Sequence, residues 1–93
     1  RTAECVYLIS REALTNVLKY ASPSAGARFA LAATNESVTV TVTNAVAPGV
    51  EDAGIGNGIT GMRERTEALG GALTITRTPE KFTLIATIPT EAE

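Results

Sequence analysis

The sequence predicts an α+β fold, in which helices pack on one face of a mixed, largely antiparallel sheet. Two segments repeat apolar side chains at the period of a helix, and four segments are rich in β-branched residues and alternate as strands do. Their order along the chain is helix, two strands, helix, two strands. With 93 residues, 44% of them hydrophobic, the chain suffices for one core, so we expect a single domain over residues 1–93.

The first helix is predicted from about Thr2 to Ala21, because the helical pattern stops before Ser22-Pro23. Its apolar positions at helical spacing are Val6, Ala13, Leu14, Val17, Leu18 and Ala21. Two strands should follow at residues 27–34 and 37–44, joined as an antiparallel hairpin around Asn35-Glu36. This half of the chain therefore supplies one helix and one hairpin.

The second half has the same order of predicted elements, a helix and then a hairpin, after a long connection. Residues 45–57 contain glycine and proline without a period, and we expect them to form a mobile loop. A helix is predicted over residues 58–69, with Met62 and Leu69 in the core, and Gly70-Gly71 is typical of a helix end. A final hairpin is predicted from residues 72–78 and 82–89, turning at residues 79–81.

Composition excludes several classes of function. The net charge of −2 and the pI near 5.1 leave no basic stripe for nucleic acid. The absence of histidine and the single cysteine, Cys5, exclude zinc sites of the His/Cys type, Ser-His-Asp triads and Cys-His dyads within this chain. Carboxylate, amide, hydroxyl, lysine, arginine and backbone groups remain, and they suit Mg²⁺ and phosphate.

Location is predicted from what the chain lacks. A single cysteine gives no internal disulfide, and no apolar run reaches the roughly 18 to 20 residues that span a bilayer. We expect a cytoplasmic location and no membrane contact by this segment. Because the chain starts at Arg1 in what reads as the middle of a helix, we expect a piece of a longer protein, which could carry an anchor elsewhere.

Three glycines, Gly56, Gly58 and Gly61, have the spacing G-x-G-x-x-G. A dinucleotide-binding fingerprint would need a strand leading straight into them, and the nearest predicted strand ends at Asn44. Two interpretations stay open, namely flexible loop glycines before a helix, or a phosphate site made of free N–H groups. The N–H groups in question belong to Asn57, Gly58, Ile59 and Thr60.

A second polar group lies on the first predicted helix. Glu12, Asn16 and Lys19 fall at i, i+4 and i+7, with Tyr20 beside them. This stripe lies nearly opposite the expected apolar face, so it could be a solvated surface with a helix ion pair. The alternative is a site in which the Asn16 oxygen binds Mg²⁺, Lys19 reaches a phosphate and Glu12 orients or deprotonates a hydroxyl or water.

These two stretches carry a family resemblance. REALTNVLKYA resembles the N-box of the GHKL (HATPase) superfamily, and GNGITGMRERTEALGG resembles the G2 region of sensor histidine kinases, especially those paired with NarL-type response regulators. The similarity extends from about Glu4 to Pro89. It implies an ATP-binding catalytic domain with the Bergerat fold, an α/β sandwich in which Mg²⁺ and ATP lie between the N-box helix and a lid.

The N-box resemblance implies that Glu12 is the catalytic carboxylate, Asn16 the Mg²⁺ ligand and Lys19 a phosphate contact. Tyr20 stands where the family usually has histidine, next to the nucleotide. The resemblance of the G2 region implies backbone contacts to the nucleotide from Asn57, Gly58 and Ile59.

The G1 box of the family has two candidates here. Asn44 ends a predicted strand where the family has an aspartate that accepts a hydrogen bond from adenine. Asp52, followed by Gly54 and Gly56 in a D-x-G-x-G pattern, is the rival. Phe82-Thr83 stands where Gly-Thr is usual, and Thr83 is a further candidate for the pocket.

The function implied is transfer of the γ-phosphoryl group of ATP to a histidine on a separate dimerisation domain, for relay to a response regulator. Because this chain contains no histidine, it cannot phosphorylate itself on histidine. Two alternatives stay open: a serine kinase of the anti-sigma-factor type, and a degenerate domain of the same superfamily that only binds a partner.

Overall fold

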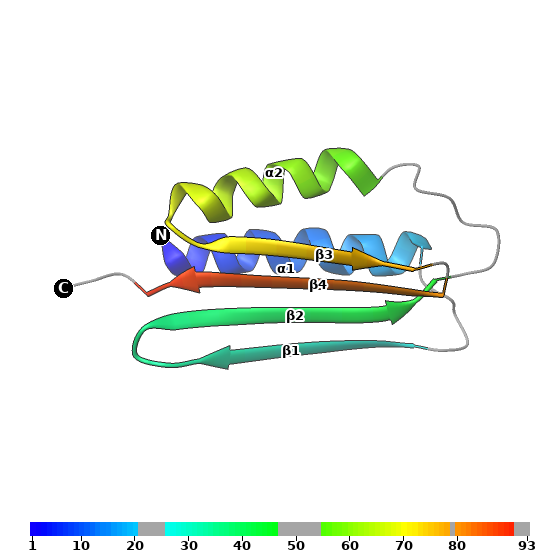
Figure 1. Ribbon diagram of the computed structural model, residues 1–93, viewed down its shortest axis with the longest axis horizontal. Helices are drawn as coiled ribbons and strands as arrows, with labels where there is room; N and C mark the ends of the chain where they lie inside the picture. Colours follow the sequence, from blue (N-terminus) through cyan, green and yellow to red (C-terminus); the bar gives the residue numbers. More distant parts are fainter. Residues whose placement is uncertain (21–25, 47–54, 79, 91–93) are drawn as a thin grey trace.

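The computed structural model describes residues 1–20, 26–46, 55–78 and 80–90, with backbone alone at 19–20 and 55–58. The elements in chain order are α1 (Thr2–Tyr20), β1 (Ala27–Ala33), β2 (Ser37–Ala45), α2 (Ile55–Ala68), β3 (Ala72–Arg77) and β4 (Lys81–Pro89). Both helices pack on one face of a four-stranded sheet (Figure 1). The predicted α+β class is therefore confirmed.

The strand order is β1-β2-β4-β3, and every described pairing is antiparallel. The central strands β2 and β4 pair along their whole length, from Ser37 opposite Pro89 to Ala45 opposite Lys81. Side chains alternate between the two faces of a strand. The helix side of β2 and β4 is the core and carries Val40, Val42, Leu84, Ala86 and Ile88, all buried. The other face is rich in threonine, which combines strand propensity with a polar group.

The buried stripe of α1 consists of Cys5, Ile9 and Ala13, spaced four residues apart. Leu14 and Leu18, expected on the apolar face, are instead 46% and 87% exposed. The expected face was thus partly wrong. Ile9 and Cys5, which were not among the apolar positions used, fill the space over the sheet and turn the two leucines outward.

The second helix, α2, begins at Ile55, three residues earlier than predicted, so Ile55, Gly56 and Asn57 belong to the helix and not to a loop. Its end agrees with the prediction. Gly70 has φ +83°, the N–H of Gly70 donates to the Glu67 carbonyl at 3.0 Å, and that of Gly71 donates to the Thr66 carbonyl at 2.9 Å. These bonds form a Schellman motif, which requires the left-handed conformation that glycine adopts without strain.

The core lies between the helices and the two central strands. Met62 is fully buried, and Leu69 packs against the core cluster as a partly buried residue, so both are where the sequence predicts them. Cys5 is buried as well. Helix α1 contacts α2, β2 and β4, whereas the seven residues of β1 are all exposed at the sheet edge.

Candidate functional site

Three segments with polar groups lie at the same end of the molecule. The second half of α1, the last residues of β2 and the first turn of α2 all reach the end at which the helices are drawn cyan and green (Figure 1). The predicted N-box residues, the G1 candidate Asn44 and the G2 residues belong to these three segments. The fold therefore gathers at one end the segments that the sequence analysis singled out separately.

The two helices run antiparallel, which sets which parts of them face each other (Figure 1). The first half of α1 meets the last half of α2 around a hollow of about 280 Å³, lined by Arg1, Glu4, Cys5, Leu8, Arg65, Ala68 and Leu69. Cys5 on α1 lies beside the side chain of Thr66 on α2. Asn16 follows Cys5 by eleven positions on α1, and Ile55 precedes Thr66 by eleven positions on α2. Because the helices run antiparallel and rise by the same distance per residue, Asn16 lies level with Ile55 at the start of α2.

Asn16 occupies an unusual environment for a polar side chain. Its Nδ2 atom is shielded from solvent and has no hydrogen-bond partner in the described part of the chain. A buried amide nitrogen without a partner costs about 1–3 kcal/mol. The stripe containing Asn16 is consequently not a simple solvated surface, and Glu12, one turn earlier, is also partly buried.

Asn44 is the second buried polar residue of this region, at the end of β2 on the helix side of the sheet. Its Nδ2 donates to the Ala45 carbonyl at 3.0 Å. With the donor engaged in this way, Oδ1 is the group that the side chain can offer to a ligand. An acceptor in this position is what the sequence resemblance assigned to Asn44.

The structure does not bring Thr83 to Asn44. In the register of β2 and β4, Thr83 is opposite Thr43, and both lie on the face away from the helices. The residue opposite Asn44 is Phe82, which is buried on the helix side. Only the pairing register decides which neighbour in a strand points inward, so the sequence could not show that Phe82, and not Thr83, lies opposite Asn44.

Other predicted residues are only partly described. Lys19 and Tyr20 end α1, and Gly56, Asn57 and Gly58 are in the first turn of α2, but of these residues only the backbone is described. Asp52 and Gly54 lie outside them entirely, as does most of the predicted loop over residues 45–57. Ile59 is buried in the core, so of this residue only the backbone could face a ligand.

The start of α2 keeps a positive electrostatic character. The first four N–H groups of a helix have no partner within it, and the helix dipole adds partial positive charge there. No acidic residue occupies the first turn of α2. Because the helix begins at Ile55, the N–H groups of its first turn belong to residues 55–58, whereas the sequence predicted those of residues 57–60.

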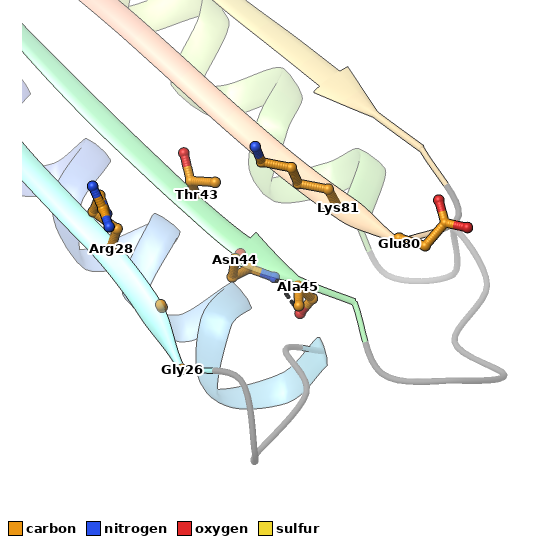
Figure 2. A pocket seen from close by; sticks show the side chains of 8 residues that line it. Gly26, Arg28, Thr43, Asn44, Ala45, Glu80 and Lys81 are labelled. Atoms are coloured by element: carbon orange, nitrogen blue, oxygen red, sulfur yellow. Dashed lines mark hydrogen bonds between the residues drawn. The ribbon is translucent and has the colours of Figure 1, made fainter.

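A hollow of about 400 Å³ lies near Asn44 at the end of the sheet. Figure 2 shows Arg28, Thr43 and Lys81 rising from three neighbouring strands, and the bond from Asn44 to Ala45. Register places these three side chains on the face away from the helices. Asn44, on the helix side, also lines the hollow, so the hollow reaches the end of β2 from the face away from the helices.

The described residues hold no cluster of three or more His, Cys, Asp or Glu side chains suited to a metal ion. A Mg²⁺ ion at Asn16 would thus depend on phosphate oxygens and water for its other ligands, which is common for this ion. In the same described segments, neither helix combines the length and apolarity needed to cross a bilayer.

Comparison with known proteins supports the kinase interpretation at the level of fold. No protein-family model and no curated protein matches the sequence. Among solved structures, the chain is similar to the histidine kinase domain of a blue-light activated histidine kinase from Erythrobacter litoralis EL346, with a TM-score of 0.75 and 25% identity. The chain has a histidine kinase-like fold. The match covers 95% of this chain and 44% of that one, so the chain spans less than half the length of this neighbour.

Proposed function

We propose that this chain is the ATP-binding catalytic unit of a two-component histidine kinase. It binds Mg-ATP where α1, β2 and α2 meet, and it passes the γ-phosphoryl group to a histidine on a separate dimerisation domain, from which a NarL-type response regulator receives it. The likeness to a histidine kinase domain supports the reaction class. The observation that carries the proposal is the shielded Nδ2 of Asn16, which has no hydrogen-bond partner among the described residues and lies level with the start of α2.

The donor set fits Mg²⁺ bound to a nucleotide. The Asn16 amide can turn about its last bond, which brings Oδ1, an oxygen ligand of the kind Mg²⁺ prefers, to the shielded position. The free N–H groups of α2 would bind phosphate oxygens, and the bound Mg²⁺ would neutralise charge on the phosphate chain.

In this proposal Asn44 recognises the adenine base. With its Nδ2 held by the Ala45 carbonyl at 3.0 Å, its Oδ1 would accept a hydrogen bond from the amino group of adenine. Guanine has a carbonyl oxygen at the corresponding ring position and offers no such donor. The chain should therefore bind ATP more tightly than GTP.

The remaining steps use the residues of this chain for positioning. Glu12 lies one turn before Asn16 on α1, where its carboxylate would orient or deprotonate the attacking group. The chain contains no histidine, so the phosphoacceptor must be supplied by another domain. Catalysis by this unit is thus the alignment of the γ-phosphate for in-line attack.

The test is calorimetric titration of the chain with a non-hydrolysable ATP analogue, with and without Mg²⁺. Asn16→Ala should weaken the Mg²⁺-dependent binding by about tenfold to a hundredfold, since it removes an interaction with a charged ligand. Thr15→Ala is the matched control, because Thr15 is an exposed neighbour on the same helix. Equal binding by both variants would show that the N-box does not hold the metal.

A second experiment tests the transfer step. The chain is mixed with a histidine-bearing dimerisation domain and ATP labelled in the γ-phosphate, and labelling of the histidine is expected. Binding of ATP without labelling of histidine would contradict the histidine kinase proposal and favour a serine kinase. Absence of ATP binding would favour the partner-binding module.

A further inference from the structure

The side chain of Asn44 is held by the main chain of the next residue. Its Nδ2 donates to the Ala45 carbonyl at 3.0 Å, and the residue is buried. The two ends of an amide group have nearly the same shape, so its hydrogen bonds decide whether oxygen or nitrogen faces a ligand. With Nδ2 turned to the Ala45 carbonyl, Oδ1 is turned the other way. Whatever leaves this carbonyl to the side chain therefore decides which group a ligand meets.

The ladder between β1 and β2 shows where the Ala45 carbonyl points. Thr34 and Ser37 continue the register of this pair of strands, and the Thr34 N–H donates to the Ser37 carbonyl at 2.8 Å. They are thus a hydrogen-bonded pair, and such pairs alternate with non-bonded pairs along an antiparallel ladder. Every second residue of β2 from Ser37 to Ala45 consequently directs its N–H and C=O toward β1. The residue that would face Ala45 in this ladder is Gly26.

The pairing of β2 with β4 leads to the same orientation. The Val46 N–H donates to the Glu80 carbonyl at 2.9 Å, and these residues continue the register in which Ala45 is opposite Lys81. Val46 and, two positions earlier, Asn44 therefore bond to the β4 side. Ala45 lies between them, so its carbonyl faces the β1 side.

Gly26 does not continue the ladder to Ala45. The pairing of β1 with β2 ends at Ala27 opposite Asn44. Gly26 has φ +72°, in the left-handed region, whereas an antiparallel strand has φ of about −140°. Figure 2 shows Gly26 at the start of β1, beside the end of β2 that carries Asn44 and Ala45. The chain thus enters the sheet at Ala27, and the Ala45 carbonyl accepts the amide of Asn44 in place of a ladder N–H.

We propose that Gly26 is a positioning residue for base selectivity, because its conformation leaves the Ala45 carbonyl to Asn44 and so keeps Oδ1 toward the base. The inference rests on the proposed function, in which Oδ1 accepts a hydrogen bond from the amino group of adenine. A reversed amide would present Nδ2, which suits a purine with a carbonyl oxygen in that position. It would also bring Oδ1 against the Ala45 carbonyl, two acceptors without a proton between them.

Gly26 can be substituted without a clash, because a Cβ there would meet no heavy atom within 4 Å apart from its chain neighbours. A side chain at this position therefore acts through the backbone conformation. Valine disfavours the left-handed region and favours strands, so Gly26→Val should extend the ladder to Ala45. The main-chain N–H at this position would then compete with Nδ2 for the Ala45 carbonyl. Asparagine enters the left-handed region more readily than most residues, which makes Gly26→Asn the matched control.

The experiment is calorimetric titration with Mg-ATP and with the Mg²⁺ complex of inosine triphosphate, which has a carbonyl oxygen where ATP has the amino group. The wild type should bind ATP more tightly. Gly26→Val should lower the ratio of the two affinities by about threefold to tenfold, which corresponds to the loss of one hydrogen bond. Gly26→Asn should keep the ratio within about twofold of the wild type. A purely structural effect would weaken both nucleotides alike and leave the ratio unchanged, and circular dichroism checks that both variants are folded.

The outcomes separate this inference from the proposed function. A wild type that prefers ATP, with the same ratio in Gly26→Val, overturns the positioning role and leaves the proposed function intact. An equal decrease of the ratio in both variants also overturns the role, because the loss would not depend on the left-handed conformation. Equal binding of the two nucleotides by the wild type shows that Oδ1 of Asn44 does not select the base, and it overturns the inference too. A wild type that binds neither nucleotide refutes the proposed function and this inference with it.

Discussion

Gly71, which follows the helix α2, should not tolerate even one additional carbon. A Cβ at this position would overlap the carbonyl oxygen of Thr87, and it would lie 3.0 Å from Cγ2 of Thr66 and 3.1 Å from Cα of Ile88. Two of these three neighbours are backbone atoms of β4, a central strand paired on both sides. Gly71→Ala therefore requires either the sheet or the end of α2 to move.

The expected cost follows from overpacking. Inserting a carbon into a packed region costs about 1–3 kcal/mol, occasionally more, and backbone neighbours place Gly71→Ala near about 3 kcal/mol. For a domain of this size each kcal/mol lowers the melting temperature by about 4–8 °C, so a decrease of about 12–24 °C is expected. The assay is thermal unfolding followed by circular dichroism, with urea unfolding to give the free energy.

Gly61→Ala is the matched control, because its Cβ would meet only the flexible end of Arg65, Nη1 at 3.5 Å. Gly61 lies inside α2, where alanine is favoured over glycine by up to about 1 kcal/mol. The two glycine-to-alanine changes should thus have opposite signs. A Gly71→Ala variant that unfolds within about two degrees of the wild type, a change too small for overpacking, would refute the close approach.

Two further predictions concern the sheet and the thiol. Leu84→Ala should lower the free energy of unfolding by about 2–5 kcal/mol. Ile85→Ala, at the next residue and on the face away from the helices, should lower it by less than about 1 kcal/mol. Urea unfolding measures both changes, and equal losses would contradict the assignment of the two faces. Burial raises the pKa of the Cys5 thiol above its ordinary value of 9.0, against smaller opposing effects of the Thr66 hydrogen bond and the Arg65 charge. The folded state therefore keeps the thiol proton to a higher pH than the unfolded state does. The contribution of Cys5 to the free energy of unfolding is complete below pH 9.0 and decreases as the pH rises above that value. The difference in stability between the wild type and Cys5→Ala, measured across alkaline pH, isolates this effect, and a flat difference would contradict it.

Much of the secondary structure followed from local signals. Both hairpins and the helix end at Gly70-Gly71 were predicted within one residue, since turn residues and β-branched runs act over short distances. The start of α2 was placed too late, because Gly56 indicates a loop when judged by propensity alone. Contacts between α2 and the rest of the core stabilise the helix beyond that local preference.

The candidate site was predictable in its residue types and less so in its geometry. Glu12 and Asn16 were named from helical spacing and the N-box resemblance, and Asn44 from its place at a strand end; the structure places their segments at one end of the fold. The choice between Thr83 and Phe82 beside Asn44 could not be made from the sequence. A shift of one residue in the pairing of β2 and β4 exchanges the two faces, and that register is set by contacts between distant segments.

By itself, the sequence determined the order of the elements and the chemistry open to a chain without histidine, because these depend on composition and local pattern. The tertiary structure alone decided which flank of α1 is buried, that Nδ2 of Asn16 is shielded with no partner among the described residues, and that β1 is an end strand of the sheet. Burial and pairing are relations between segments far apart in the chain. They come into existence only when the helices close over the sheet.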